Sequence, residues 1–290
     1  MTQTNSGSLF WFLMMGVALP AVMVARAFRS PNGRQMQQWA EWCGVVVTPA
    51  NEELIRSHLG RVRRYRSIAA FPFWWLYPAP LVLGSEFPAA LASPVPALAA
   101  YLAGALVAEL TVGSSGPRPI KQASFSPRTV RDFLPGWIRT LPWVQFAVGG
   151  GLVLLSQQTD ATSSRTGALL TLGAAAGLAL LAELATRRIV SRPQRGGDAD
   201  VLAADDGLRA TAVSMTAGVA VLAGLIAVSA GLEVAVPPTS GAPIGWWGWI
   251  ALGWPVLSMV LSVGVLSCVI RQQTWGYRRR HRQDLLADLS

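Results

Sequence analysis

Residues 167–188, with the sequence GALLTLGAAAGLALLAELATRR, decide how this chain folds. Residues 167–186 are almost entirely apolar and contain a single charged side chain, Glu183, and two arginines follow directly. A membrane-spanning helix needs about 20 such residues, because the hydrocarbon core of a bilayer is about 30 Å thick. The stretch therefore predicts a transmembrane helix that ends at a basic loop.

Similar apolar runs occur along the whole chain. Of its 290 residues, 52% are hydrophobic and only 13% are charged, whereas an average soluble domain carries about 25% charged residues. We therefore expect one all-α, polytopic membrane domain over residues 1–290. The seven predicted transmembrane helices are Leu9–Ala25, Ile68–Gly84, Leu91–Val112, Trp137–Ser156, Gly167–Thr186, Ala212–Leu232 and Trp246–Ile270.

The basic residues predict the orientation of this domain. With seven spans, all 24 Lys and Arg residues except Arg165 fall in segments on one side of the membrane. Loops rich in Lys and Arg stay on the cytoplasmic side. No positive charge precedes the first apolar run, as one would in a signal peptide, so we expect it to be retained. The N-terminus is predicted outside and the C-terminus in the cytoplasm.

Two predicted cytoplasmic parts carry most of this charge, a helical insertion at 26–67 and a basic tail at 271–290. In the insertion, Met36, Trp39, Trp42 and Cys43 recur at helical spacing, which predicts a small helical hairpin over the inner face. Thr48 and Pro49 have the residue types of a helix start. The arginine-rich stretch that follows, to Arg66, predicts a basic amphipathic helix along the membrane surface.

Arginines in these two parts are the candidates for binding anionic lipid headgroups, or a membrane or cytoplasmic protein partner. They are Arg61, Arg63, Arg64, Arg66, Arg278, Arg279 and Arg280.

An internal match suggests a repeated helix hairpin at 68–140 and 142–214. Leu106–Leu110 aligns with Leu180–Leu184, so that Glu109 meets Glu183, and Arg118 then meets Arg192. Whether the match reflects duplication is left open, because alanine and leucine matches carry little weight in this composition.

Glu109 and Glu183 are the acidic residues within the predicted spans, where ionisable groups are costly and are functional candidates. Both lie near the inner end of their helix, which allows two interpretations. Each can form an interfacial ion pair with a loop arginine, with Arg118 and Arg192, or Arg187 and Arg188, as candidate partners. Alternatively, the two form a paired acidic site for a cation or a proton.

Small and polar residues in the spans suggest how the helices pack. Gly173 and Gly177 form a GxxxG pair, which favours close helix packing within the bundle or in a dimer. Gly149–Gly151 and the pair Pro78 and Pro80 are either breaks of the kind that line transporter sites or kinks. Gln145 is expected to form a hydrogen bond between helices.

The sequence contains none of the common motifs for catalysis or for binding a cofactor that we looked for. We find no Walker loop, dinucleotide fingerprint, HExxH or GxSxG pattern, so no catalytic residue and no cofactor is predicted. The two cysteines and two histidines are too few for a disulfide framework or a metal site. The basic residues lie beside apolar runs rather than on a separate domain, so membrane topology explains them better than nucleic-acid binding does.

Two short stretches resemble a known group of proteins. They are Val47–Glu52 (VTPANE), ahead of an arginine-rich helix, and Ala123–Pro135, which contains ASFSPR and DFLP. These stretches are similar to multipass membrane proteins of high-GC Gram-positive bacteria that carry no assigned activity. The resemblance implies a bacterial plasma membrane and transfers no functional residue.

The function expected from these observations is that of a non-enzymatic structural or accessory protein, or the membrane subunit of a transport system. The alternative is a small-molecule or lipid transporter that uses Glu109 and Glu183. A membrane-embedded enzyme acting on lipid is a third interpretation. A transporter predicts a polar cavity that both glutamates reach, whereas a subunit predicts a filled bundle with a basic or apolar surface left open.

Overall fold

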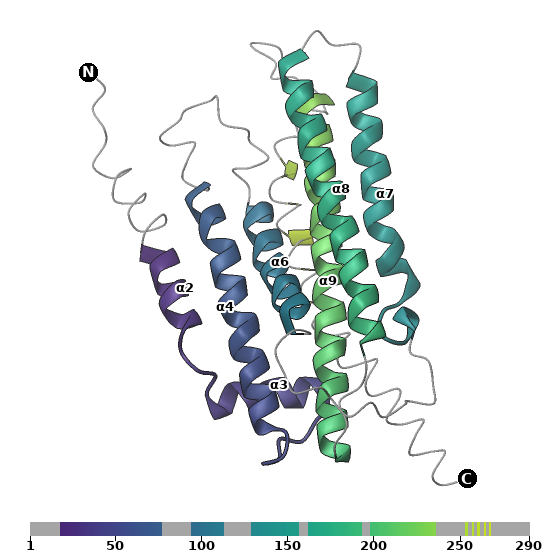
Figure 1. The fold of residues 1–290 in the computed structure, drawn as a ribbon. Helices are drawn as coiled ribbons and strands as arrows, with labels where there is room; N and C mark the ends of the chain where they lie inside the picture. The colour runs from purple at the N-terminus through teal and green to yellow at the C-terminus, as the bar shows by residue number, and fades with distance from the viewer. Residues whose placement is uncertain are drawn as a thin grey trace, which may run out of the picture.

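The computed structural model describes residues 18–76, 94–112, 129–156, 162–192 and 198–235, and isolated positions between 253 and 267. Within these ranges the chain is helical and contains no strand. The helices are α2 (Leu19–Ala27), α3 (Gly33–Cys43), α4 (Glu52–Leu76), α6 (Pro94–Val112), η3 (Val130–Asp132), α7 (Gly136–Leu155), α8 (Thr162–Ser191) and α9 (Ala199–Ala235). Figure 1 shows them as an elongated bundle with α3 lying across one end.

Three described helices are long and apolar enough to cross a membrane: Gly136–Leu155, Arg165–Ser191 and Ala199–Ala235. A shorter apolar helix covers Leu98–Thr111. These four contain the cores of the expected third to sixth spans. The first and second expected spans are described only in part, and the seventh only at isolated positions, so a total of seven lies beyond the described residues.

Helix α9 is the centre of the bundle. It has 37 residues, about 55 Å at 1.5 Å per residue, and it is buried along most of its length. Helices α7 and α8 pack along it, α6 packs on it as well, and α4 and α2 continue the layer beyond α6 (Figure 1). Its Ala, Gly, Val and Leu residues leave little polar surface on any side, which is why it can be surrounded.

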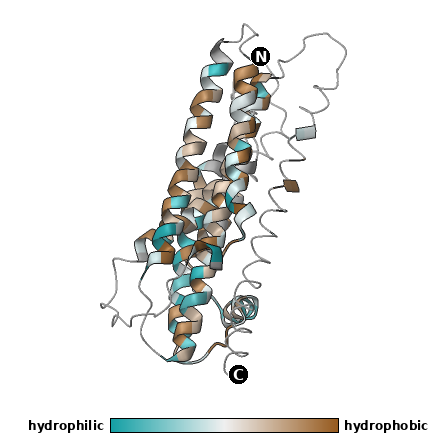
Figure 2. Ribbon diagram, turned by 90° about the vertical axis from the view of Figure 1, so that its right-hand side faces the viewer, coloured by the Kyte–Doolittle hydropathy of each residue, from teal (hydrophilic) through white to brown (hydrophobic). Residues whose placement is uncertain are grey.

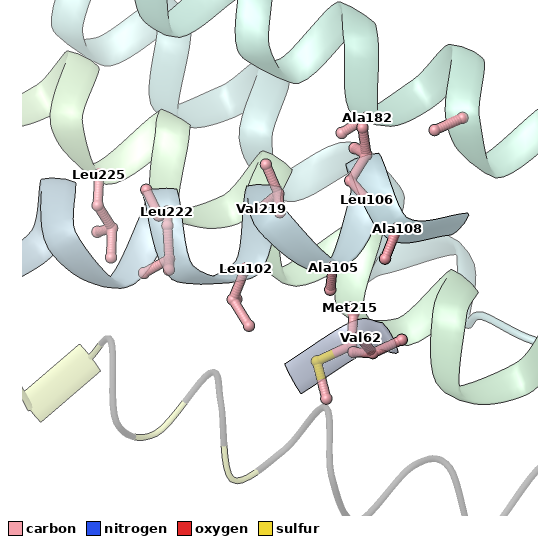
Figure 3. Packing of buried hydrophobic residues seen from close by; sticks show 12 residues of the cluster. Val62, Leu102, Ala105, Leu106, Ala108, Ala182, Met215, Val219, Leu222 and Leu225 are labelled. Carbon is pink, nitrogen blue, oxygen red and sulfur yellow. The ribbon is translucent and has the colours of Figure 1, made fainter. Parts of the chain in front are cut away.

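Leucine, valine and alanine form the main core between α6 and α9. Leu102 and Leu106 of α6 lie against Val219 and Leu222 of α9, and Ala182 of α8 closes the cluster (Figure 3). This contact holds the end of α6 against α9 and fixes the position of Glu109, which lies one turn beyond Ala105.

The outer faces of α7 and α8 are apolar and exposed. Leu154, Leu155, Leu170 and Leu184 are each more than 60% exposed, and hydrophobic residues dominate the upper part of the bundle in Figure 2. Such a surface is unfavourable in water and suits contact with lipid. These faces agree with membrane insertion of α7 and α8.

At the other end, α3 and the start of α4 form a second small core with α9. Met36, Trp39 and Cys43 are buried there with Ile55 and Leu208. Trp42 is 50% exposed and does not join them. The predicted helix containing Met36, Trp39 and Cys43 is confirmed as α3, although Trp42 is not part of its buried face.

Local hydrogen bonds define the ends of α3. Asn32 and Gln35 form a capping box at its start, and Gly44 ends it with a φ of 66°, a left-handed conformation that glycine adopts without strain. Beyond it, the fully buried side chain of Asn51 donates to the carbonyls of Val46 and Asp200. Asn51 thus ties the loop before α4 to the start of α9.

The expected surface helix at 49–66 is wrong. The arginine-rich stretch belongs to α4, one helix from Glu52 to Leu76, which stands alongside α6 rather than across the bundle end (Figure 1). No proline interrupts the stretch before Pro72, so the basic half continues directly into the apolar half. The helix α4 begins at Glu52, after a turn in which the amide of Glu52 donates to the carbonyl of Thr48.

The predicted role of Gly173 and Gly177 within the bundle is not seen. A Cβ on either residue would meet nothing within 4 Å among the described residues, and both glycines are exposed. Helix α8 instead turns alanines toward α9, including Ala175, Ala179 and Ala182.

Other glycines permit close helix approach. A Cβ on Gly104 would lie 2.7 Å from Cα of Arg66, and one on Gly149 would lie 2.5 Å from the carbonyl oxygen of Ala227. Helix α7 also runs unbroken through Gly149–Gly151, so no helix break occurs there. Pro78 and Pro80 lie outside the described residues.

Candidate functional site

A buried cluster of charged side chains lies at the arginine-rich end of the bundle. Four helix segments supply it: His58 comes from α4, Glu109 from the end of α6, Arg192 from the residue after α8, and Asp205 and Arg209 from α9. His58, Glu109, Asp205 and Arg209 are each less than 10% exposed. We call these five residues the ionic cluster.

The carboxylate of Glu109 faces a basic side chain on two sides. Its Oε1 lies 3.1 Å from Nε2 of His58, and its Oε2 lies 3.6 Å from Nη1 of Arg192. The guanidinium of Arg66 is also close enough to stabilise the negative charge, and it stacks over the ring of Tyr101 at 5.4 Å. A carboxylate at this depth is tolerated because cations surround it.

Two arginines of the cluster also cap helix ends. Arg192 donates through Nη2 to the backbone carbonyl of Glu109 at 2.6 Å, near the end of α6. Arg209 donates through Nη1 to the carbonyl of Arg192, also at 2.6 Å, directly after α8. The last carbonyls of a helix have no partner within the helix and carry partial negative charge, so a guanidinium satisfies both needs. The ends of α6 and α8 and the first part of α9 are thereby joined.

Asp205 completes the cluster on α9. Its Oδ2 accepts from Nε of Arg209 at 3.0 Å and from Nη2 at 2.7 Å. The two residues are one helical turn apart, the spacing at which opposite charges on a helix meet. Helix α9 begins at Ala199, well before the predicted start at Ala212. The charged residues in 199–211 favour a loop in the sequence, but the pairing of Asp205 with Arg209 allows this stretch to be a buried part of the helix. The predicted topology placed Arg209 in a loop. In the structure, Arg209 is instead a paired residue within α9.

The cavity within this cluster is small, about 30 Å³, roughly the volume of one water molecule in the liquid. Its lining includes Glu109 and Asp205, and also Arg61, Arg192 and Arg209. Guanidinium groups thus outnumber carboxylates around it. A bound cation would be repelled, so the cluster is better suited to holding helices together than to cation coupling.

Glu183 lies in a separate environment. It accepts from Arg139 and from Nε of Arg187, the latter at 3.0 Å. Its cavity, also about 30 Å³, lies between α7, α8 and α9. The hydroxyls of Thr186 and Thr216 meet there at 2.7 Å. Glu109 and Glu183 therefore line different cavities, and the single polar cavity that a coupled pair requires is not formed by them.

The two glutamates of the internal match also differ in burial. The side chain of Glu109 is 5% exposed and that of Glu183 is 20% exposed. Arg192, which the match aligns with Arg118, pairs with Glu109 rather than with Glu183. Arg118 itself lies outside the described residues. The two sites are not equivalent in their contacts.

Three members of the ionic cluster were missed in the sequence: His58, Asp205 and Arg209. His58 lies within an arginine tract, yet it follows Ile55 by three residues and precedes Val62 by four, which places it on the buried face of α4. Asp205 and Arg209 were read as loop residues, although their spacing is that of a helical ion pair. Both signals were available. Gln145 lies against Gly224 of α9, but its Oε1 does not form the expected hydrogen bond between helices within the described part of the chain.

The candidate binding arginines of α4 have different surroundings. Arg63 donates to Oε1 of Gln35 at 2.6 Å and so supports the start of α3. Arg66 turns inward toward Tyr101 and Glu109. Arg61 and Arg64 line an open cavity beside α4. Arg278, Arg279 and Arg280, with the rest of the expected tail, lie outside the described residues.

Among the described residues at this end, Cys43 is the titratable group whose pKa is clearly raised. Burial raises the pKa of its thiol to about 11, and a hydrogen bond with Thr211 lowers it in part. The Sγ atom lies 3.6 Å from Oγ1 of Thr211. The thiol is therefore neutral at physiological pH and serves as a packing residue.

Comparison of the chain with protein-family models, curated proteins and solved structures finds no match.

Proposed function

We propose that the chain is an integral protein of a bacterial plasma membrane that acts as a non-enzymatic structural or transport-system subunit. In this proposal it crosses the membrane seven times, with its N-terminus outside and its C-terminus in the cytoplasm. The arginine-rich end of the bundle is then the inner face, and it binds anionic lipid headgroups or a protein partner.

One observation carries this proposal: the arginine-rich end contains two kinds of arginine. Arg192 and Arg209 are used internally, on carboxylates and helix ends. Arg61 and Arg64 form no salt bridge within the described ranges, and both line an open cavity, although Arg61 also reaches the small cavity at Glu109. Guanidinium groups left open beside the membrane-spanning part of a bundle favour anionic ligands.

The interior of the bundle also favours a subunit over a transporter. Helix α9 is buried along most of its length, and the cavities at Glu109 and Glu183 each hold about 30 Å³. A solute with its hydration shell is larger than one water molecule. Filled packing around α9 within the described residues, together with an open basic surface, is the combination expected for a protein that holds a partner or lipid.

Purification in a gentle detergent, followed by mass spectrometry of bound lipid and protein, tests the proposal. We expect an anionic phospholipid or a defined protein to remain bound in a fixed ratio. The control is an unrelated multipass protein of similar size, expressed and purified identically. Recovery of neither above the control level would contradict the proposal. So would solute uptake into reconstituted vesicles that is lost in both Glu109→Gln and Glu183→Gln.

A further inference from the structure

The larger of the openings that Arg61 and Arg64 reach is a cavity of about 560 Å³ beside α4. One wall is α4 and the other is the linker between α2 and α3, at Ser30 and Pro31. Its size falls within the range of about 300–1,000 Å³ typical of small-molecule sites. It is much larger than the cavity of the ionic cluster.

The cavity is strongly basic. Arg61 and Arg64 are three residues apart, so both project from one side of α4. Arg56, which also lines the cavity, is held by Glu52. The acidic residue of the lining, Glu53, has a side chain that is 80% exposed and reaches only Nη1 of Arg56, at 3.9 Å. The two open guanidinium groups therefore have a net charge that an anion can balance.

Hydroxyl groups add donors to the same cavity. Ser30 and Tyr65 line its wall, and so does Ser57, whose Oγ donates to the carbonyl of Leu54. A phosphate group has several acceptor oxygens, and arginine binds two of them at once with strong, charge-assisted hydrogen bonds. Two arginines with neighbouring hydroxyls match this chemistry.

An apolar surface continues from the cavity along α4. Ile68 follows Arg64 by four residues and Phe71 follows it by seven, which places all three on one face of the helix. Ile68 is 54% exposed and Phe71 is 39% exposed. At about 1.5 Å per residue, they lie about 6 and 10 Å further along the helix, toward its apolar half. A ligand with a charged head and an apolar chain fits this order.

We propose that this cavity binds the phosphate of an anionic phospholipid from the inner leaflet, with one acyl chain lying along Ile68 and Phe71. The inference rests on the proposed function, because it requires this end of the bundle to face the inner leaflet. Arg61 and Arg64 hold the phosphate, and the apolar face of α4 selects a lipid over a soluble phosphate compound.

The experiment uses the full-length protein in detergent micelles, with phosphatidylglycerol or phosphatidylcholine added. Lipid binding is measured by native mass spectrometry and by the shift in thermal unfolding temperature. Arg61→Gln/Arg64→Gln is compared with Arg131→Gln/Arg188→Gln, which removes the same charge from exposed arginines elsewhere. Arg64→Gln alone, at an exposed position, is the second variant if the double variant does not fold. Ile68→Gln/Phe71→Gln tests the acyl-chain contact.

We expect phosphatidylglycerol to bind the wild type and the control variant equally, and to bind Arg61→Gln/Arg64→Gln at least about tenfold more weakly. Ile68→Gln/Phe71→Gln should weaken the lipid without changing the response to millimolar inorganic phosphate. If phosphatidylglycerol binds the Arg61→Gln/Arg64→Gln variant as it binds the wild type, the cavity is wrong and the lipid is held elsewhere on the basic face. If inorganic phosphate stabilises the wild type as much as phosphatidylglycerol does, a soluble phosphate is the ligand instead. If the wild type does not distinguish phosphatidylglycerol from phosphatidylcholine, lipid binding by the basic face fails as well.

Discussion

At the scale of single residues, the main feature of the described structure is that its buried charges have partners. Glu109, Asp205 and Arg209 lie in the interior at positions where an unpaired ion would be prohibitively costly. Each instead contacts an opposite charge or a helix terminus. Removal of one member therefore leaves its partners buried and unpaired, which costs more than the loss of a surface pair.

Glu109→Gln is expected to lower stability by about 3 kcal/mol, because it leaves the charge of Arg192 and the Nε2 atom of His58 without a carboxylate. Glu183→Gln should cost only about 0.2–1 kcal/mol, since the side chains of Arg139 and Arg187 are 43% and 64% exposed. Thermal unfolding of the purified variants in detergent measures both. The exposed Glu233→Gln is the control and gives the loss of stability expected from removing a surface charge. Equal losses of stability for Glu109→Gln and Glu183→Gln would contradict the prediction that the ion pairs of Glu109 contribute more.

Cys43 is expected to resist alkylation in the folded protein. With a pKa of about 11, about one thiol in a thousand is ionised at pH 8, and the thiolate is the reactive form. In a Cys268→Ala background, labelling should be slow until the protein is unfolded, and then become fast. Labelling of the folded protein as rapid as that of a model thiol would contradict the burial of Cys43.

The same raised pKa predicts a pH dependence of stability. The folded state binds the thiol proton more tightly than the unfolded chain, so this contribution is fully present below pH 9 and is lost as the pH rises toward 11. Cys43→Ala should remove this part of the alkaline destabilisation, which thermal unfolding between pH 8 and pH 11 would detect.

At the scale of helices, small residues determine which faces meet. Helix α4 approaches α6 at Gly104, and α7 approaches α9 at Gly149 and Gly231. Helix α8 meets α9 through alanines and leaves its glycines outside. The close crossing of α4 and α6 matters most for the site, because it brings His58 to Glu109.

Gly104→Ala is expected to destabilise the protein by about 1–3 kcal/mol, the usual cost of overpacking. The added methyl group would overlap the backbone of α4 at Tyr65 and Arg66. Gly173→Ala is the matched control, since its methyl group would meet nothing within 4 Å, and alanine favours a helix by up to about 1 kcal/mol. The unfolding temperature should therefore fall for the first variant and stay level or rise for the second. The opposite order would refute this helix packing.

At the scale of the whole molecule, hydropathy predicted the helical class and the cores of α6, α7, α8 and α9. Apolar runs of this length can hardly form anything else in a membrane. Boundaries failed where charges were buried: Asp205 and Arg209 marked a loop in the sequence, yet they satisfy each other inside a helix. Their spacing of four residues is that of a pair on one helix, but the sequence does not show that neighbouring helices bury this pair, because burial depends on the packed arrangement.

The candidate site was predicted only in part for the same reason. Glu109 stood out as an acid in an apolar run, and Arg192 was among its expected partners, but His58 was hidden in an arginine tract. The GxxxG pair was misleading because the sequence gives the spacing of small residues and not the face that a neighbouring helix covers. The orientation of α4 was predicted wrongly because the same basic amphipathic pattern is found in helices on a membrane surface and at the end of helices that stand upright in a bundle.

The central claim is that the arginine-rich end of the bundle faces the cytoplasm. It is tested most directly with Ser240→Cys and Gln194→Cys, each in a chain that also carries Cys43→Ala and Cys268→Ala. A maleimide that does not cross membranes is applied to intact cells and, separately, to permeabilised cells. The account predicts that Ser240→Cys is labelled in intact cells and that Gln194→Cys is labelled only after permeabilisation. Labelling of Gln194→Cys in intact cells, with Ser240→Cys protected, would contradict it.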